Sequence, residues 1–565
     1  MYFVDPAGDD SGPGTIDHPF ATLERARDAS RAAATRGAVI SLRAGTHRLT
    51  RTLHLTGADS GVVYQAHGYG TAEQEEVVIS GGRVITGWTE AGAGVRRAEA
   101  PGLATRQLSV GGRRVPRASA LLEHEPTRTD SGYRSTHPEA RSWNGEVELV
   151  YQGAYPWSEA RCPVQAVERD GETTVLTMAQ PAFARASRLY RAVVPWQEGE
   201  DVAVDRPTHV ENSPDLLTGG TFALDNGVLY HRPGPEDRLS EDSSGEADEV
   251  VAPVLERLVH ATGATGLVFR GITFADTTWL RPSQPEGFLH YHGNGYHDGG
   301  DVFTVEFTEG GHVTVPTDSA AMPGNVLFDN CSRTVLEGCR LTRMGAVALE
   351  FHGGRANTVR RSRVDGVSGG GVVVTGETRT RIEDTHVHGV GRDYRGSPAI
   401  LLSDTREALV AHNRVGHVPH AGIVLYSSRG ARLLSNLVHD TMLVLADGGG
   451  IYVSEPQGEG EEDTAVVARN VVRDTVTSYN FGLYTDYGAA WLSVRDNVVH
   501  RAETPVVLQV WPPLEHVSFV GNHWDADPGP APEGVTLSGN RVLAEADFAT
   551  DPRVAAVVAQ AGPRT

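Results

Sequence analysis

The chain has 565 residues, a formal net charge of −22 and only 7% aromatic residues. It contains no lysine, so every fixed positive charge is an arginine. An acidic surface repels polyanions, which argues against nucleic acid and against strongly acidic polysaccharides as partners. The 65 glycines suit an architecture of short strands and many turns.

The three cysteines, Cys162, Cys331 and Cys339, are an odd number and lack CxxC spacing. A disulfide framework or a zinc site is therefore not expected, and we predict buried thiols and no cofactor. The opening, Met1 to Asp5, has neither a basic nor an apolar leader segment, and no apolar run reaches the roughly 18 residues that span a membrane. We expect a cytoplasmic protein without a membrane partner. Secretion is the alternative if a leader is removed. The oligomeric state is open.

The first 82 residues predict an N-terminal cap followed by the first coils of a larger repeat. A turn-rich opening precedes an amphipathic helix in which Phe20, Leu23, Ala26 and Ala29 share a face. Such a helix can cover the open end of a stack of strands, whose edges would otherwise stay unpaired. Apolar β-branched runs follow at 39–42, 53–55, 62–64 and 77–79.

Residues 83–257 lose this rhythm and predict an inserted β-rich subdomain. Short alternating segments, such as 147–150 and 174–177, are separated by irregular turns, and the acidic stretch 236–249 predicts an exposed loop. Coils resume at Leu267 to Phe274, with a Gly/His/Tyr-rich excursion from Trp279 to Pro323. We therefore assign 258–540 to the main repeat and 541–565 to a C-terminal tail with a short helix.

A short phrase recurs eight times between Gly338 and Trp524, at steps of 23 to 34 residues. Each copy has a small or amide residue, a spacer and an apolar residue, and each repeat adds a second β-branched run without helical periodicity. Self-similarity at this period is typical of a solenoid. We predict an all-β fold, a right-handed parallel β-helix with an N-terminal capping helix and the inserted subdomain. The amides that recur in the phrase should form an inward ladder in one turn; they are Asn413, Asn436, Asn470, Asn497 and Asn522.

Alignment of the second strand of each coil predicts which side chains face outward. Side chains alternate between faces along a strand, and the apolar places alternate with places that become polar or aromatic in the later coils. The outward residues there are Tyr426, Tyr452, Ser454, Tyr484, Asp486 and Gln509. Aromatic faces, amides and a carboxylate on a rigid surface suit a sugar chain, so we expect an oligo- or polysaccharide substrate.

Asp447 and Asp486 are the candidate catalytic pair. They lie on consecutive coils of this face, and the three glycines after Asp447 indicate a sharp turn or close approach of a ligand. Glycoside hydrolysis needs two carboxyl groups that flank the scissile bond. Glu455 and Glu350 are further outward acids. The remaining substrate-binding candidates are Tyr426, Tyr452, Tyr484, Glu455, Tyr487, Gln509, Trp511 and His352.

Several motifs together resemble glycoside hydrolase family 141. They are the opening 4–15 with 19–23, and 79–88, 211–217, 224–233 and 269–274, together with Asp447-Gly-Gly-Gly-Ile-Tyr452 and Leu483-Tyr-Thr-Asp486. The resemblance spans nearly the whole chain. It implies α-L-fucosidase or xylanase activity on a neutral glycan, with two aspartates, Asp447 and Asp486, as acid and base or nucleophile. The chain departs from the family pattern at Tyr487, where relatives often have a second acid, and in the acidic loop that follows Glu455.

Two other functions stay open from the sequence. A polysaccharide lyase shares this fold class and abstracts a proton beside a uronate with a basic or tyrosyl side chain, for which His352, His420 and Arg395 are candidates. A non-catalytic glycan-binding solenoid is the second alternative.

Overall fold

The computed structural model describes residues 1–33, 37–143, 146–193, 199–237 and 248–564. The chain divides into two compact units. The first, here called the β-helix unit, comprises residues 1–81, 257–275 and 323–565, and the second, the inserted unit, comprises 82–256 and 276–322. The excursion from Trp279 to Pro323 therefore groups almost entirely with the inserted unit. Most of the acidic stretch 236–249 lies outside the described residues.

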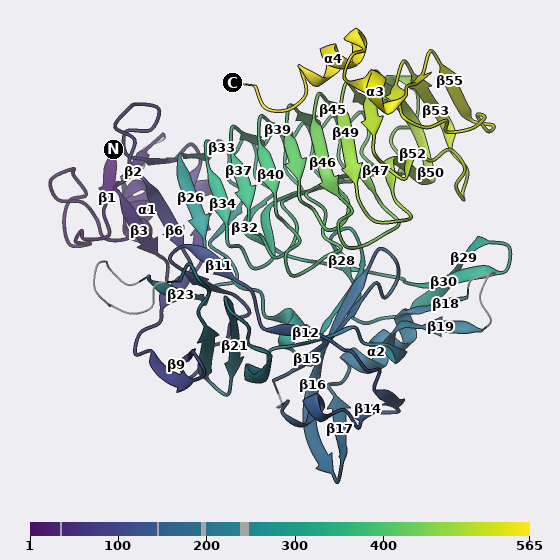
Figure 1. Cartoon of the computed structure of the whole chain (residues 1–565). Coiled ribbons are helices and arrows are strands. Elements are labelled where there is room, and N and C mark those ends of the chain that lie inside the picture. The colour runs from purple at the N-terminus through teal and green to yellow at the C-terminus, as the bar shows by residue number, and fades with distance from the viewer. Residues whose placement is uncertain (34–36, 144–145, 194–198, 238–247, 565) are drawn as a thin grey trace. The chain divides into compact units, whose positions relative to one another are not determined.

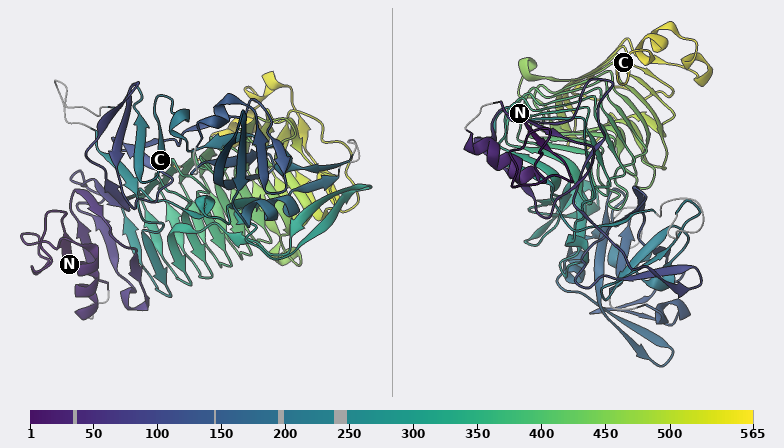
Figure 2. Two further views of the ribbon diagram at one scale, coloured as in Figure 1. Left: turned by 90° about the horizontal axis from the view of Figure 1, so that it is seen from below. Right: turned by 90° about the vertical axis from the view of Figure 1, so that its left-hand side faces the viewer.

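The β-helix unit is a stack of parallel coils, each made of three short strands (Figure 1). One coil contains β44 (Ile423–Tyr426), β45 (Arg432–Leu434) and β46 (Leu437–Thr441). Each strand pairs in parallel with its equivalents one coil before and one coil after, for example Ile423 opposite Ile451. The predicted parallel β-helix is confirmed, and Figure 2 shows its strands side by side along the stack.

The strands of the stack form three columns. The column that carries the candidate acids contains β4 (Leu53–Leu55), β24 (Val259–Thr262), β32 (Gly324–Asp329), β35 (Val347–His352), β38 (Val372–Thr375), β41 (Ile400–Ser403), β44, β47 (Gly449–Pro456), β50 (Phe481–Arg495) and β52 (Thr504–Val506). The next contains β1 (Tyr2–Val4), β2 (Val39–Leu42), β5 (Val63–Ala66), β25 (Val268–Arg270), β33 (Val335–Glu337), β36 (Thr358–Arg360), β39 (Arg381–Glu383), β42 (Leu409–Ala411), β45, β48 (Ala465–Ala468), the end of β50, β53 (Glu515–Val520) and β55 (Val535–Ser538). The third contains β3 (Gly45–Arg48), β6 (Val77–Ser80), β26 (Ile272–Ala275), β34 (Arg340–Thr342), β37 (Arg363–Asp365), β40 (His386–His388), β43 (Arg414–Gly416), β46, β49 (Val471–Thr475), β51 (Val498–His500), β54 (His523–Trp524) and β56 (Arg541–Val542).

The N-terminal end of the stack carries the predicted helix, α1 (Leu23–Ala32). The Thr22 side chain accepts a hydrogen bond from the Arg25 N–H and so caps its first turn. Leu23 and Ala26 are buried, as the amphipathic pattern predicts. At the other end, α3 (Glu545–Phe548) and α4 (Pro552–Val558) follow the last coil.

An amide ladder runs through one turn of the coils, as predicted. The Asn436 side-chain amide donates to Asn470 Oδ1 at 2.9 Å and to the Val410 carbonyl at 2.9 Å. The pattern repeats along the stack and extends to Asn540. Each amide satisfies turn backbone that has no partner in a sheet, so the ladder has a structural role.

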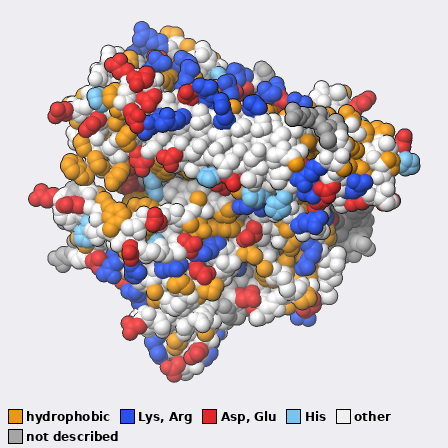
Figure 3. Space-filling model, turned by 180° about the vertical axis from the view of Figure 1, so that it is seen from behind, with side chains coloured by type: hydrophobic (Ala, Val, Ile, Leu, Met, Phe, Trp, Pro, Cys, Tyr) orange, Lys and Arg blue, Asp and Glu red, His pale blue; other side chains and the backbone are white. Residues whose placement is uncertain are grey.

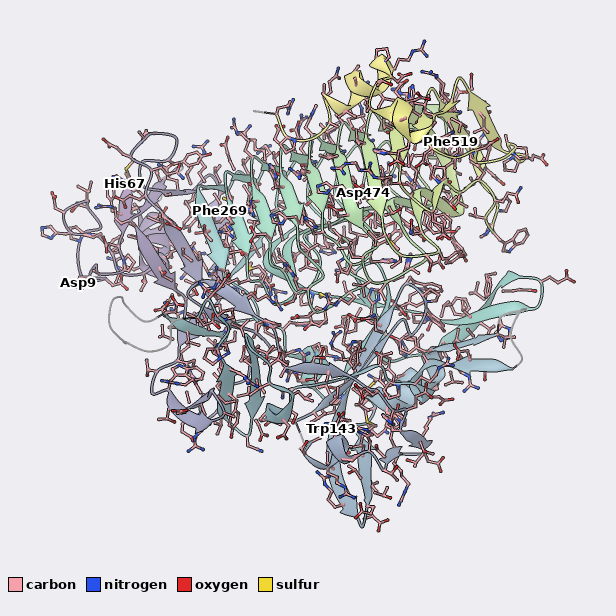
Figure 4. All side chains as sticks on the ribbon, viewed as in Figure 1. Asp9, His67, Trp143, Phe269, Asp474 and Phe519 are labelled. Carbon is pink, nitrogen blue, oxygen red and sulfur yellow. The ribbon has the colours of Figure 1, made fainter. Side chains whose placement is uncertain are left out.

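The interior of the stack is apolar and includes aligned aromatic rings. Phe269 stacks on Tyr64 with ring centroids 5.2 Å apart, and Phe328 stacks on Phe351 at 5.4 Å. Figure 4 places Phe269 and Phe519 in coils far apart along the stack. Full burial of one such side chain contributes about 1.5–3 kcal/mol, so the repeated inward positions supply the main stabilisation of each coil.

The inserted unit consists mainly of antiparallel sheets. β15 (Glu148–Gln152) pairs with β16 (Glu159–Asp170), and β16 pairs with β17 (Thr173–Met178). The helix α2 (Ala182–Leu189) packs its buried face into the same apolar core.

Charged side chains of both signs lie close together on the surface, as the face in Figure 3 shows. In the third column, for example, Arg340 and Arg363 both pair with Asp365. Cys162, Cys331 and Cys339 are buried and free, as predicted. Among the helices described, none is both long and apolar enough to cross a membrane.

Candidate active site

Strands β47 and β50 present the candidate residues on adjacent coils. Tyr452 lies opposite Tyr484, and Ser454 lies opposite Asp486. Ile451 and Val453, which alternate with these residues along β47, are buried and point into the core. This is the register predicted from the sequence, and it aligns Tyr426, Ser454 and Asp486 in one outward file.

A tight turn holds Asp447 immediately before β47. Asp447 has a left-handed backbone with φ of 54°, and its N–H donates to the Tyr479 carbonyl on the next coil at 2.8 Å. The glycines that follow are required by close packing. A Cβ at Gly448 would approach His420 Nε2 to 2.7 Å, and one at Gly450 would approach Val472 Cγ1 to 2.4 Å. The sequence signal Asp-Gly-Gly-Gly thus marks a carboxyl group that is followed by backbone packed too closely for larger side chains.

Each carboxyl group accepts a hydrogen bond from a tyrosine on the neighbouring coil. The Tyr484 hydroxyl donates to Asp447 Oδ1 at 2.9 Å, and the Tyr452 hydroxyl donates to Asp486 Oδ2 at 2.7 Å. The two rings contact each other edge to face, with centroids 5.1 Å apart. Asp447 and Asp486 are therefore brought into one site and joined through a pair of phenols.

Burial raises the pKa of both carboxyl groups. Burial and the negative charge of Asp486 together raise the pKa of Asp447 to about 7, against the lowering effect of the hydrogen bond from Tyr484. Burial also raises the pKa of Asp486, while hydrogen bonds from Tyr452 and from the Tyr487 N–H lower it. Asp447 therefore keeps a bound proton to much higher pH than an ordinary aspartic acid.

The tyrosines are less open than the alternation pattern suggests. The sequence predicts an outward aromatic surface, but Tyr452 and Tyr484 are only 5% and 7% exposed. Their edge-to-face packing and their bonds to the acids account for this burial. Tyr426 is half-buried and packs edge to face on Tyr452, with centroids 6.0 Å apart.

Other predicted residues lie at the margin of the acid pair. Glu455 follows Ser454 and accepts a hydrogen bond from the Ser427 hydroxyl at 2.6 Å. Tyr487 directly follows Asp486 and is exposed. The expected strand through Gln509 is wrong, because β52 ends at Val506. Gln509 and Trp511 belong to the following loop, and both are exposed.

His352 is not brought to the acid pair. It shares the outward file of Asp486, but five steps of parallel pairing separate them. At about 4.8 Å per coil this is roughly 24 Å. The His352 imidazole instead pairs with Asp329 at 3.0 Å. Glu350, from the same strand, accepts a hydrogen bond from the Gly324 N–H at 2.7 Å.

Two residues near the acids were not identified from the sequence, and a third was assigned to another function. Tyr479 supplies the carbonyl that fixes Asp447, and Phe481 packs against Tyr484 with centroids 4.3 Å apart. His420, considered only as a lyase base, is buried beside the Asp447 turn, with Nε2 3.2 Å from the Ala446 carbonyl. Burial lowers the His420 pKa to about 4, so the ring is neutral. Tyr479 and His420 lie in connecting loops, where the sequence has no alternating pattern that could predict the direction of a side chain.

The arrangement fits proton transfer by carboxyl groups. Among the described residues, no group of three or more His, Cys, Asp or Glu side chains has the geometry to hold a metal ion. Of two carboxyl groups in one site, one can protonate a leaving oxygen while the other assists attack at the adjacent carbon.

Comparisons with known proteins support the fold. Residues 321–461 match a family described as "Right handed beta helix region". A solved structure titled "Glycoside hydrolase" is 21% identical, with a TM-score of 0.76 over 100% of this chain and 99% of that one. "The complex structure of XylC with xylose" is 13% identical, with a TM-score of 0.51 over 92% and 75% of the two chains. No curated protein matches the sequence. The chain is thus similar to glycan-active β-helix proteins in its fold.

Proposed function

We propose that the protein is a glycoside hydrolase in which Asp447 is the general acid and Asp486 is the base or nucleophile. The observation that carries the proposal is the geometry of two acids on adjacent coils, each bonded to a tyrosine hydroxyl of the other coil, with the two tyrosine rings in contact. A carboxyl group whose pKa is raised to about 7 beside a second carboxyl group is typical of acid–base catalysis on a glycosidic bond. The fold-level similarity to a structure titled "Glycoside hydrolase" supports the same reaction class.

The chemistry follows from the hydrogen bonds of the pair. The Asp447 O–H donates its proton to the glycosidic oxygen as the bond from that oxygen to the anomeric carbon breaks. The Asp486 carboxylate, held by Tyr452, either attacks the anomeric carbon or takes a proton from the attacking water. In both cases its charge stabilises the cationic sugar in the transition state.

The proposed substrate is a neutral glycan, α-L-fucoside-like or xylan-like. The family resemblance names these two activities, and the similar structure solved with xylose agrees with the second. An acid pair in a chain of net charge −22 favours a neutral sugar over a uronate, because the uronate charge would be repelled.

The test is turnover of nitrophenyl α-L-fucoside, β-xyloside, arabinoside and galactoside by the wild-type chain and its variants. Asp447→Asn and Asp486→Asn should each lower kcat by about 10²- to 10⁴-fold, which is typical when a proton-transfer group is removed. Asp404→Asn is the matched control, since Asp404 has the same left-handed backbone, with φ of 52°, but is exposed on another coil.

Other outcomes would assign a different function. Wild-type turnover that survives both Asp→Asn changes would refute the roles given to the pair. An unsaturated product that absorbs in the ultraviolet would indicate a lyase. Glycan binding without turnover, unaffected by Asp447→Asn, would indicate a binding solenoid.

A further inference from the structure

A second candidate binding site lies in the inserted unit. The described residues that line a cavity of about 730 Å³ all belong to that unit, so the cavity shares no residue with the acid pair of the β-helix unit. Ligand-binding cavities in proteins measure about 300–1,000 Å³. This cavity therefore has the size of a site for a small molecule or a short oligomer.

The floor of the cavity is apolar, and two hydrophobic cores contribute to it. Val147 and Val164 belong to the core around β15, β16 and β17, whereas Leu103 and Leu224 belong to a second core. All four side chains are buried. The pairing register of β16 with β17 shifts directly after Val164, and such bulges are frequent beside functional sites, where they redirect side chains. A cavity between two packed cores is a common position for a ligand site.

Asn212 joins three segments of the cavity wall. It is buried and has a left-handed backbone with φ of 67°. Its side-chain amide donates to the Glu146 carbonyl at 3.0 Å and to the Leu224 carbonyl at 2.8 Å, and its Oδ1 accepts the Leu224 N–H at 3.0 Å. Because all three residues line the cavity, its shape is fixed before a ligand binds, which lowers the entropy cost of binding.

A buried ion cluster forms another part of the wall. The Glu148 carboxylate accepts hydrogen bonds from Arg106 Nη1 at 2.6 Å, Arg117 Nη1 at 2.8 Å and the Ser283 hydroxyl at 2.7 Å. Burial acts to raise the pKa of Glu148, but the charges of Arg106 and Arg117 outweigh it and hold the pKa at about 2. The Arg117 Nε–H is buried and has no hydrogen-bond partner within the described residues. Arg117 therefore keeps donor capacity that the protein itself does not use.

Glutamine side chains from three separate segments line the rim. They are Gln165 in β16, Gln180 before α2 and Gln284 after η5 (Arg281–Ser283), and all three are exposed. Gln180 Oε1 accepts the Ala184 N–H at 3.2 Å, which orients that amide. Each primary amide offers two donors and an acceptor, a combination that suits neighbouring hydroxyl groups.

The charges and ring types of the lining indicate the class of ligand. The lining contains one arginine, Arg117, and two glutamates, Glu146 and Glu148. It has no excess of positive charge, so a phosphate or a uronate gains little attraction there. None of the described residues that line the cavity is aromatic, which disfavours a nucleobase, because bases bind by stacking. A neutral ligand with many hydroxyl groups and apolar C–H surface fits best.

We infer that the cavity binds a neutral oligosaccharide, whose C–H faces pack on the apolar floor while Arg117 and the glutamines of the rim bond its hydroxyl groups. The choice of a sugar among neutral polar ligands rests on the proposed hydrolase function. The inserted unit then holds the glycan at a second point, which raises its effective concentration near the enzyme. Hydrogen bonds without aromatic stacking give modest affinity, so Kd should be about 0.1–1 mM.

Protection of one introduced thiol tests this site by itself. The three native cysteines are buried, so a thiol at the rim, Gln284→Cys, should react selectively with iodoacetamide in the folded chain. The chain also carries Asp447→Asn, which keeps the sugar intact. Neutral trisaccharides of xylose, mannose and galactose are the probes, and trigalacturonic acid is their acidic counterpart. The bound trisaccharide, at roughly ten times its Kd, should slow alkylation by about tenfold, as read by mass spectrometry.

Glu168→Cys is the matched control, because Glu168 is exposed on β16 but does not line the cavity; its alkylation should not slow. Adding Gln165→Ala to the Gln284→Cys chain should weaken the protecting sugar about fivefold. Circular dichroism establishes that each variant is folded. No protection by any neutral trisaccharide, equal protection at Glu168→Cys, an effect independent of Gln165→Ala, or protection by trigalacturonic acid alone overturns the inference.

These outcomes are separate from failure of the proposed function. If Asp447→Asn and Asp486→Asn abolish turnover but no sugar protects the rim thiol, the hydrolase stands and the cavity site is wrong. If a neutral sugar protects the thiol but the wild-type chain cleaves no glycoside, the cavity site stands and the hydrolase proposal fails.

Discussion

The Asp447 carboxyl group should lower the free energy of unfolding at neutral pH. Asp447→Asn should raise it again. The pKa of Asp447 rises from 3.8 to about 7 on folding. A shift of one unit corresponds to 1.36 kcal/mol, so the penalty reaches about 4 kcal/mol above pH 7. Since Asp447 is half-buried as a residue, we expect a penalty of about 2–4 kcal/mol.

The sign of the pH dependence follows from proton binding. Below pH 3.8 the Asp447 carboxyl is neutral in both states and costs nothing. As the pH rises towards about 7, the unfolded chain loses the proton before the folded one, so stability falls. The asparagine variant is neutral throughout and lacks this loss. Its advantage over wild type should be near zero at pH 4 and full at pH 8.

Urea unfolding at the two pH values measures this difference. Because the chain has two compact units, the transition of the β-helix unit must be followed separately, for example by pulsed thiol labelling of its buried cysteines Cys331 and Cys339 with mass-spectrometric readout of each site. Asp404→Asn should shift neither midpoint. An advantage for Asp447→Asn that is absent, or equal at pH 4 and pH 8, would show that Asp447 titrates near its ordinary pKa and is not the acid.

Three further substitutions test the partners of the pair and the scaffold. Tyr484→Phe removes the hydrogen bond that lowers the pKa of Asp447, so the alkaline limb of the pH–rate profile should move to higher pH. Tyr452→Phe removes the hydrogen bond that lowers the pKa of Asp486, so the acidic limb should also move to higher pH. The value of kcat should fall and KM should change less. A change confined to KM would instead indicate that Tyr452 stacks on the sugar. Asn470→Ala breaks the amide ladder and leaves buried groups without partners, which should cost about 2–4 kcal/mol in urea unfolding; unchanged stability would contradict the structural role of the ladder.

The scaffold could be predicted from the sequence because its determinants are local and repeated. Asparagines such as Asn413 and Asn436 occupy the same position in successive coils. In this turn the amide of one coil hydrogen-bonds to the amide of the next. The register of β47 against β50 also follows from the sequence, since a slip of one residue would turn Ile451 out of the core.

The details of the site could not be predicted because they depend on loops and packing. Alternation places Tyr452 outward, but it does not reveal that the phenol bonds Asp486 and is buried. Tyr479 precedes its strand, so the alternation of side chains along a strand could not predict the direction of its ring. His352 satisfies the outward pattern, but the pattern holds for every coil and does not indicate which coils share a site.

The central claim is tested most directly by the pH dependence of kcat/KM for a hydrolysed glycoside. With Asp447 as the acid, activity should fall as the pH rises through about 7, and it should fall at low pH as Asp486 takes up its proton. A rate that stays constant from about pH 6 to 9, or an alkaline limb that persists unchanged in residual Asp447→Asn activity, would contradict the assignment.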